Sequence, residues 1–256
     1  GTLCSYTPQE VLDAGGIASV GLCGTSNETI PDAEKVLPKN LCPLIKSTYG
    51  FAYSEKCPYT YFSDIIVGET TCDGKKKMYE LLNDIKETHI LHLPQGQDRP
   101  YAKDIWYEEV KLLKERLEKK FNVTITEDDL RKAVRKRNEL RKVLCEMYEL
   151  QQTCPPAMRG TEMMLAFQKG SFTFDLDQQI EHIRGLVEEA KKSYAAGERI
   201  VPASAKRILI TGCPTGGVIQ KVGMVVENNG GVIVCLDDCS GERTRSLMID
   251  ENADDI

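Results

Sequence analysis

Three cysteines stand at equal intervals in one stretch of the sequence: Cys42, Cys57 and Cys72. The first two are each followed by proline, and the third follows the apolar run 65–67 and opens a segment with a helical pattern. Soft thiolate ligands at loop and helix-start positions suit zinc or an iron–sulfur cluster better than they suit core packing. Residues 40–77 therefore predict a metal-binding stretch.

The number and spacing of the cysteines favour a cluster over zinc or disulfides. Ten cysteines occur among 256 residues, but disulfide frameworks are typical of small, loop-rich secreted chains. Zinc sites usually contain close CxxC pairs, and the sequence has none. Cysteines dispersed over several loops are more typical of an iron–sulfur cluster held between domains. The alternative is that they are small buried residues at the ends of elements.

Hydrophobic periodicity predicts strands that alternate with helices. The expected strands are 17–22, 64–68, 89–93, 207–211 and 232–236, and the main expected helices are 44–51, 75–83, 101–121, 126–150, 161–167, 176–194 and 218–228. Thr7 and Glu10, with Pro8 between them, have the form of a capping box for a further short helix. Such alternation is typical of βαβ units. We expect an α/β fold of two Rossmann-like, doubly wound parallel-sheet domains with a helical connection.

The pattern also predicts domain boundaries. Residues 1–160 are expected to form a first α/β cluster-binding domain with long helices, residues 161–204 a helical connector, and residues 205–256 the start of a second α/β domain. The first residue is not methionine, and the last seven resemble the first turn of a helix without its continuation. We therefore expect a fragment with a truncated second domain.

Several cysteines fall where an α/β fold places its site. Four follow the end of an expected strand within four residues: Cys23, Cys72, Cys213 and Cys239. Ligands bind beyond the carboxyl ends of strands in open α/β sheets, so a site is expected there. Cys145 and Cys235 lie inside a helix and a strand and are expected in the core, whereas Cys4 and Cys154 remain unassigned.

Composition narrows the function classes. The net charge of −6, from 39 acidic and 33 basic residues, argues against a general nucleic-acid binder. No apolar run approaches the ~18 residues of a membrane span, and no signal-peptide pattern is seen, so we expect a cytoplasmic protein.

The glycine-rich turn 212–217 could cradle a phosphate but matches no nucleotide motif. No Ser-His-Asp or GxSxG pattern occurs.

Several motifs together resemble the 2-hydroxyacyl-CoA dehydratase family, and most closely its double-cubane-cluster reductase branch. They are LCSYTPQEVLDAGG, NLCPLIKSTYG, DIIVGETTCDGKKKMYELL, LHLPQ, ITGCPTGG and VIVCLDDCSGER. The resemblance covers essentially the whole chain, and these motifs are specific in combination.

The resemblance implies an oxygen-sensitive iron–sulfur cluster, either 4Fe–4S or a double-cubane 8Fe–9S cluster. Cys42 and Cys72 correspond to two of the three cluster ligands in the dehydratases. Cys57 and Cys239, and beyond them Cys213 or Cys23, would suit the double-cubane branch, which uses six cysteines. The resemblance also implies an ATP-hydrolysing activator protein, a small-molecule or acyl-CoA substrate, and a homodimer or heterodimer. It assigns no catalytic residue beyond these ligands.

Cysteines outnumber any acid–base constellation, which favours electron transfer over hydrolysis. We expect an iron–sulfur reductase that receives low-potential electrons from the activator and reduces a small substrate. The alternative is a subunit of a 2-hydroxyacyl-CoA dehydratase, which eliminates water by radical chemistry. A third hypothesis is a non-catalytic, metal-stabilised scaffold.

Overall fold

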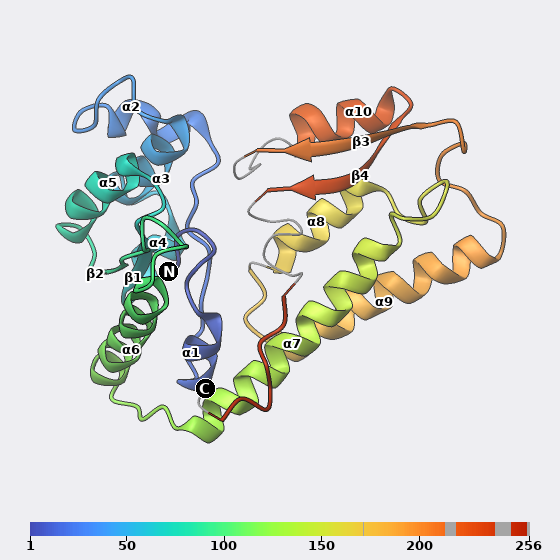
Figure 1. Cartoon of the computed structure of the whole chain (residues 1–256). Coiled ribbons are helices and arrows are strands. Elements are labelled where there is room, and N and C mark those ends of the chain that lie inside the picture. Colours follow the sequence, from blue (N-terminus) through green and yellow to red (C-terminus); the bar gives the residue numbers. More distant parts are fainter. Residues whose placement is uncertain (171, 213–218, 239–246, 255–256) are drawn as a thin grey trace. The chain divides into compact units, whose positions relative to one another are not determined.

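The computed structural model describes residues 1–170, 172–212, 219–238 and 247–254 (Figure 1). By compactness the chain divides into unit 1, Gly1–Leu130, and unit 2, Arg131–Ile256. The expected boundaries at 160 and 204 concern the domains of the whole protein. Compactness of this chain does not decide them, so they stay a prediction.

The sheet of unit 1 is parallel throughout. Strand β1 (Ile66–Glu69) pairs with β2 (Thr88–Leu91). On the other side of β1, Thr2 forms parallel bridges to Val67 and to Gly21. The order across the sheet is therefore residues 20–22, residues 1–3, β1 and β2. The expected strand 17–22 is thus present only around Gly21. The segment 1–3 is not among the expected strands because it is too short to show alternation.

Helices cover both faces of this sheet. They are α1 (Gln9–Ala14), the 3-10 turn η1 (Asn27–Thr29), α2 (Ile30–Ala33), α3 (Pro43–Tyr53), α4 (Pro58–Phe62), α5 (Asp73–Asn83) and α6 (Ala102–Phe121). Side chains alternate along a strand, so β1 contributes to two cores. Ile66 packs with Met78 and the other apolar residues of α3 and α5, whereas Val67 packs with Leu113 and Leu117 of α6.

Unit 2 combines long helices with a second parallel pair of strands. Its elements are most of α7 (Glu127–Glu149), then α8 (Gly160–Gly170), α9 (Leu176–Ala195), β3 (Lys206–Thr211), the π-helical turn η2 (Ile219–Gly223), α10 (Met224–Asn228) and β4 (Gly231–Asp237). Strands β3 and β4 are parallel, with an irregularity after Ile208. Helices α7 and α9 lie side by side (Figure 1), and the Arg184 guanidinium lies 3.2 Å from the Glu139 carboxylate.

Two contacts explain the start of two of these helices. Thr126 caps the start of α7, because its hydroxyl donates to Asp129 at 2.5 Å and accepts from the Asp129 N–H at 3.2 Å. A Cβ on Gly160 would lie 2.3 Å from the carbonyl oxygen of Ile233. Only glycine therefore allows the first turn of α8 to approach β4 so closely.

The fold class is confirmed as a mixed α/β chain with parallel strands. Two complete Rossmann-like domains are not confirmed, since the described residues contain one parallel strand pair in each unit and the bridged segments of unit 1.

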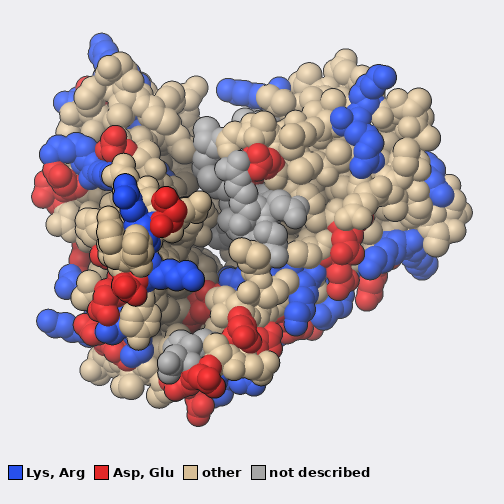
Figure 2. Space-filling model, viewed as in Figure 1, with Lys and Arg blue, Asp and Glu red and all other residues tan. Residues whose placement is uncertain are grey.

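None of the described helices is long and apolar enough to cross a membrane. On the face seen in Figure 2, basic and acidic side chains are interspersed.

Candidate functional site

Cys42 and Cys72 occupy equivalent positions at two neighbouring helix starts. Cys42 is the N-cap residue of α3 and Cys72 that of α5, and both are exposed. A Cβ on Gly74 would lie 2.7 Å from Ile45 Cδ1, so the starts of α5 and α3 pack closely against each other. Sulfur is a preferred ligand atom of soft metal centres, and an exposed side chain leaves it accessible. Both cysteines are therefore suited to bind a soft metal centre.

Cys57 has a different environment. It precedes α4, a short helix that the sequence did not predict, and its sulfur accepts from the Thr60 N–H at 3.4 Å. Half-buried, it already serves as a helix cap. Among the residues that the structure describes, no three His, Cys, Asp or Glu side chains are arranged to hold a metal ion, so Cys57 is not gathered with Cys42 and Cys72. Cys239 and Cys213 lie outside the described residues.

The donor chemistry nevertheless fits an iron–sulfur cluster. Thiols at helix starts are the ligand type that such clusters require, and Cys42 and Cys72 are not engaged in disulfides. Cys145 in α7 and Cys235 in β4 lie within regular elements and are half-buried, so their expected place in the core is not confirmed. Unit 1 therefore offers part of a ligand set in its described residues, and not a complete one.

A second polar cluster was not predicted, and it begins at Cys4. Cys4 follows the segment 1–3 and has φ 72°, in the left-handed region that non-glycine residues rarely adopt. Its sulfur lies 3.4 Å from the Thr71 hydroxyl and accepts a hydrogen bond from the buried Lys75 ammonium. Burial is the largest single effect and lowers the pKa of Lys75. The hydrogen bond to Cys4, together with the charges of Cys4, Tyr79 and Cys23, outweighs it and holds that pKa above its usual range.

Glu69, the last residue of β1, is the centre of this cluster. Its carboxyl is fully buried, and Oε1 accepts from the backbone N–H groups of Tyr6 at 2.5 Å and Thr7 at 2.6 Å and from the Thr7 hydroxyl at 3.2 Å. Oε2 has no hydrogen-bond partner among the described residues. Burial raises the pKa of Glu69 from 4.5 to about 7, against those three hydrogen bonds and the charge of Lys75.

Two further groups, Tyr79 and Cys23, interact electrostatically with Glu69. The Tyr79 hydroxyl accepts from the Glu69 N–H at 3.2 Å, and burial raises the pKa of Tyr79 to about 12. Burial also raises the pKa of the Cys23 thiol, opposed by the charge of Lys75. The sequence feature that could have indicated Glu69 is an acidic residue at the end of an apolar strand, IIVGE.

The predicted capping box at Thr7 is wrong for this reason. Pro8 is the N-cap of α1 and no side chain caps that helix. The backbone N–H and the hydroxyl of Thr7 both donate to the Glu69 carboxylate, which holds Thr7 against the end of β1 and not at the N-cap position.

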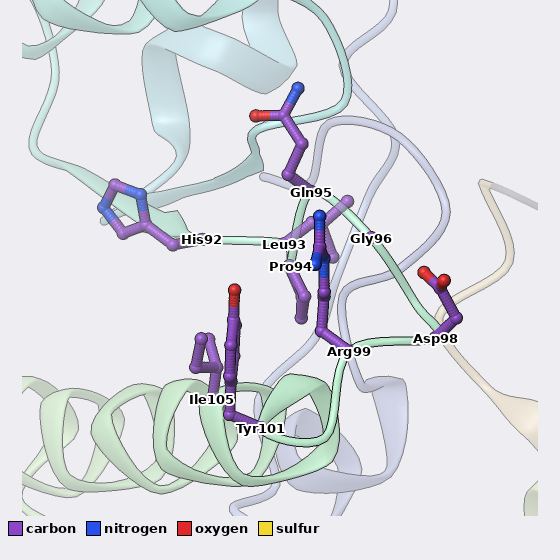
Figure 3. Close-up of a pocket in the computed structure, with 9 residues that line it drawn as sticks. All are labelled: His92, Leu93, Pro94, Gln95, Gly96, Asp98, Arg99, Tyr101 and Ile105. Atoms are coloured by element: carbon purple, nitrogen blue, oxygen red, sulfur yellow. The ribbon is translucent and has the colours of Figure 1, made fainter.

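A pocket of about 470 Å³ follows β2 (Figure 3). In Figure 3 the side chains of Gln95, Arg99 and Tyr101 project to the same side, and the His92 ring points away from Arg99. The Leu93 N–H donates to the Thr70 hydroxyl at 2.8 Å. This bond ties the pocket loop to the segment that leads from β1 to Cys72, so both lie at the carboxyl edge of the sheet in unit 1.

Comparison with known proteins identifies relatives along the whole chain. The family described as "2-hydroxyglutaryl-CoA dehydratase, D-component" matches residues 4–256. The "Putative dehydratase subunit YjiM" of Escherichia coli (strain K12) is 42% identical over 254 residues, which are 99% of this chain and 66% of that protein.

Two more distant relatives carry names with a stated activity. The "(R)-phenyllactyl-CoA dehydratase beta subunit" of Clostridium sporogenes is 26% identical over 83% of this chain and 55% of its own length. A subunit of benzoyl-CoA reductase from Thauera aromatica is 23% identical over 64% of this chain and 43% of its own length. The chain thus spans about two thirds or less of the length of these three relatives.

Proposed function

The chain belongs to the 2-hydroxyglutaryl-CoA dehydratase D-component family, and from this membership we propose that it is the cluster-binding part of a 2-hydroxyacyl-CoA dehydratase-type subunit. The observation that carries the proposal is the pair of exposed cysteines, Cys42 and Cys72, at the packed starts of α3 and α5. Both lie within the family motifs quoted above, and both lie in unit 1.

The proposed ligand set begins with two cysteines of unit 1. Cys42 and Cys72 would hold a 4Fe–4S or a double-cubane 8Fe–9S cluster, and Cys239 and Cys57 would be further ligands in the double-cubane case. For Cys57 this requires its sulfur to exchange the Thr60 N–H for a metal bond. A bound cluster supplies one-electron transfer at low potential, tuned by burial and by hydrogen bonds to sulfur.

The residues of this chain contribute binding and orientation. The starts of α3 and α5 present the two ligand sulfurs at exposed N-cap positions. The pocket after β2 receives a small molecule or the acyl part of a coenzyme A thioester, and Arg99 and Tyr101 orient its polar end. The Leu93–Thr70 hydrogen bond holds this pocket next to the segment that leads to Cys72.

The relatives named above are subunits, which supports an enzyme of several components. We propose that an ATP-hydrolysing activator protein donates the electron, that the subunit works as a homodimer or heterodimer, and that the enzyme acts in an anaerobic cytoplasm.

A reductase is the second candidate. It was the first expectation from the sequence, and the benzoyl-CoA reductase relative favours it. The dehydratase proposal takes precedence because the family description and two of the three relatives named above are dehydratases.

The test uses the full-length protein, isolated anaerobically, with its activator protein, ATP and a reductant. Elimination of water from a 2-hydroxyacyl-CoA thioester supports the dehydratase. Reduction of a small substrate without thioester turnover supports the reductase. Iron content separates the clusters, because a single cubane gives about four iron atoms per chain and a double cubane about eight. A protein that binds neither iron nor thioester contradicts both.

A further inference from the structure

Two buried glutamates of this chain differ in how their oxygens are satisfied. Glu227 accepts from the Gly160 N–H at 2.8 Å through Oε1 and from the Thr161 hydroxyl at 2.5 Å through Oε2. Glu69 receives all three of its donors on Oε1, and its buried Oε2 has no partner in the described part of the chain. A buried polar atom without a partner is costly. Glu227 therefore has the contacts of a structural carboxylate, whereas Glu69 keeps one oxygen free for a proton.

The surroundings of Glu69 set opposing demands on its charge. On one side, Lys75 and Tyr79 of α5 face it, and on the other, Cys4 and Cys23 follow the neighbouring strand segments. On β2, the residue opposite is Leu91, which is apolar. Donors on Oε1 and the charge of Lys75 favour the carboxylate, while burial favours the neutral acid. Because these effects oppose each other, a small change in the nearby charge is enough for the carboxyl to gain or lose its proton near neutral pH.

The position of Glu69 connects it to the proposed electron-transfer site. Glu69 ends β1, and the chain runs directly through Thr70 and Thr71 to Cys72. An electron that arrives at a metal centre held by Cys72 adds one negative charge close to the buried polar residues around Glu69. In surroundings of low dielectric constant such a charge is costly unless an opposite change accompanies it. Protonation of Glu69 is such a change.

We propose that Glu69 takes up one proton from solvent when one electron enters the site held by Cys42 and Cys72. This inference rests on the function proposed above. The electron comes from a low-potential one-electron donor protein, the Glu69 carboxylate becomes the carboxylic acid, and the net charge of the site is unchanged. When the electron leaves for the substrate, Glu69 releases the same proton. Glu69 is a positioning residue for charge and need not touch the substrate.

The primary experiment measures the reduction potential of the iron-loaded full-length protein between pH 5 and pH 9. For uptake of one proton with one electron, the wild-type potential falls by about 59 mV per pH unit above pH 7, by the constant for a one-electron couple, and is flat at lower pH. Glu69→Gln makes it flat throughout. Glu227→Gln, the same change at the fully partnered carboxylate, retains the wild-type slope.

A second variant guards against misfolding of Glu69→Gln. Thr7→Val removes the hydroxyl donor to Oε1 and leaves Glu69 in place, so the pH at which the slope begins moves upward. In the protein without iron, infrared spectroscopy with labelled glutamate checks the same group, and the pKa of the Glu69 carboxyl is expected near 7.

The failures are distinguishable. A protein that binds iron but has a potential independent of pH from 7 to 9, or a Glu69→Gln variant with the wild-type slope, overturns the inference and leaves the proposed function intact. A Thr7→Val slope that begins at the wild-type pH also overturns it. A protein that binds no iron overturns the proposed function, and the inference with it.

Discussion

The substitution Glu69→Gln should abolish a large pH dependence of stability in unit 1. The pKa of Glu69 is raised by burial from 4.5 to about 7. A carboxyl with a raised folded-state pKa contributes stability that is fully present below 4.5 and is lost as the pH rises through 7. At about 1.4 kcal/mol per pH unit, the loss for a fully buried group is about 3 kcal/mol. Glutamine is neutral and has no such loss.

The assay is urea unfolding followed by tryptophan fluorescence. Trp106 is the single tryptophan of the chain and packs against the α6 core of unit 1, so its signal reports the unit that contains Glu69. The free energy of unfolding is measured for wild type and variant from pH 4.5 to pH 8. We expect the wild type to lose about 3 kcal/mol relative to the variant over this range.

The control is Glu80→Gln, a carboxylate of α5 whose side chain is 63% exposed. Its unfolding free energy should follow the wild type at every pH. A constant difference between wild type and Glu69→Gln from pH 4.5 to pH 8 would refute the reasoning, because it would mean that Glu69 titrates alike in the folded and unfolded chain.

Three further predictions follow from single contacts. Gly68→Ala places a Cβ 2.6 Å from Tyr79 Cζ and should lower the unfolding free energy of unit 1 by about 1–3 kcal/mol; an unchanged urea midpoint would contradict the close contact. Gly185→Ala lies inside α9 with no atom within 4 Å of the new Cβ, so a rise of about 0.5–1 kcal/mol is expected in stability measured by circular dichroism; a fall would argue against an open site. Cys72→Ser should strongly reduce the iron bound by the full-length protein while Cys145→Ser does not, and equal iron in both variants would remove Cys72 from the ligand set.

Periodicity predicted the long elements well, because the apolar residues of each packing face recur at regular spacing within one continuous segment. The apolar spacing of residues 101–121 and 126–150 corresponds to α6 and α7 almost to the residue. Short elements were less predictable. The segment 1–3 becomes a sheet strand only through bridges to Gly21 and Val67, and such pairing depends on residues that are distant in sequence.

The candidate site also has parts that local sequence predicts and parts that depend on residues distant in sequence. Cys42 and Cys72 could be located from motifs, because each stands directly before a helix that the sequence predicts. The cluster around Glu69 could not be, since its parts come from residues 4–7, the end of β1, and α5. Thr7 is the clearest case: its local pattern is a helix cap, and its hydroxyl instead donates to a carboxylate 62 residues away.

The most direct test of the proposed function is the metal and sulfide content of the full-length protein after strictly anaerobic isolation. We predict a brown protein with iron and acid-labile sulfide in near-equal amounts, at about four or about eight iron atoms per chain, and with a cluster that a low-potential activator can reduce by one electron. A colourless protein that contains only zinc under the same conditions would contradict the account.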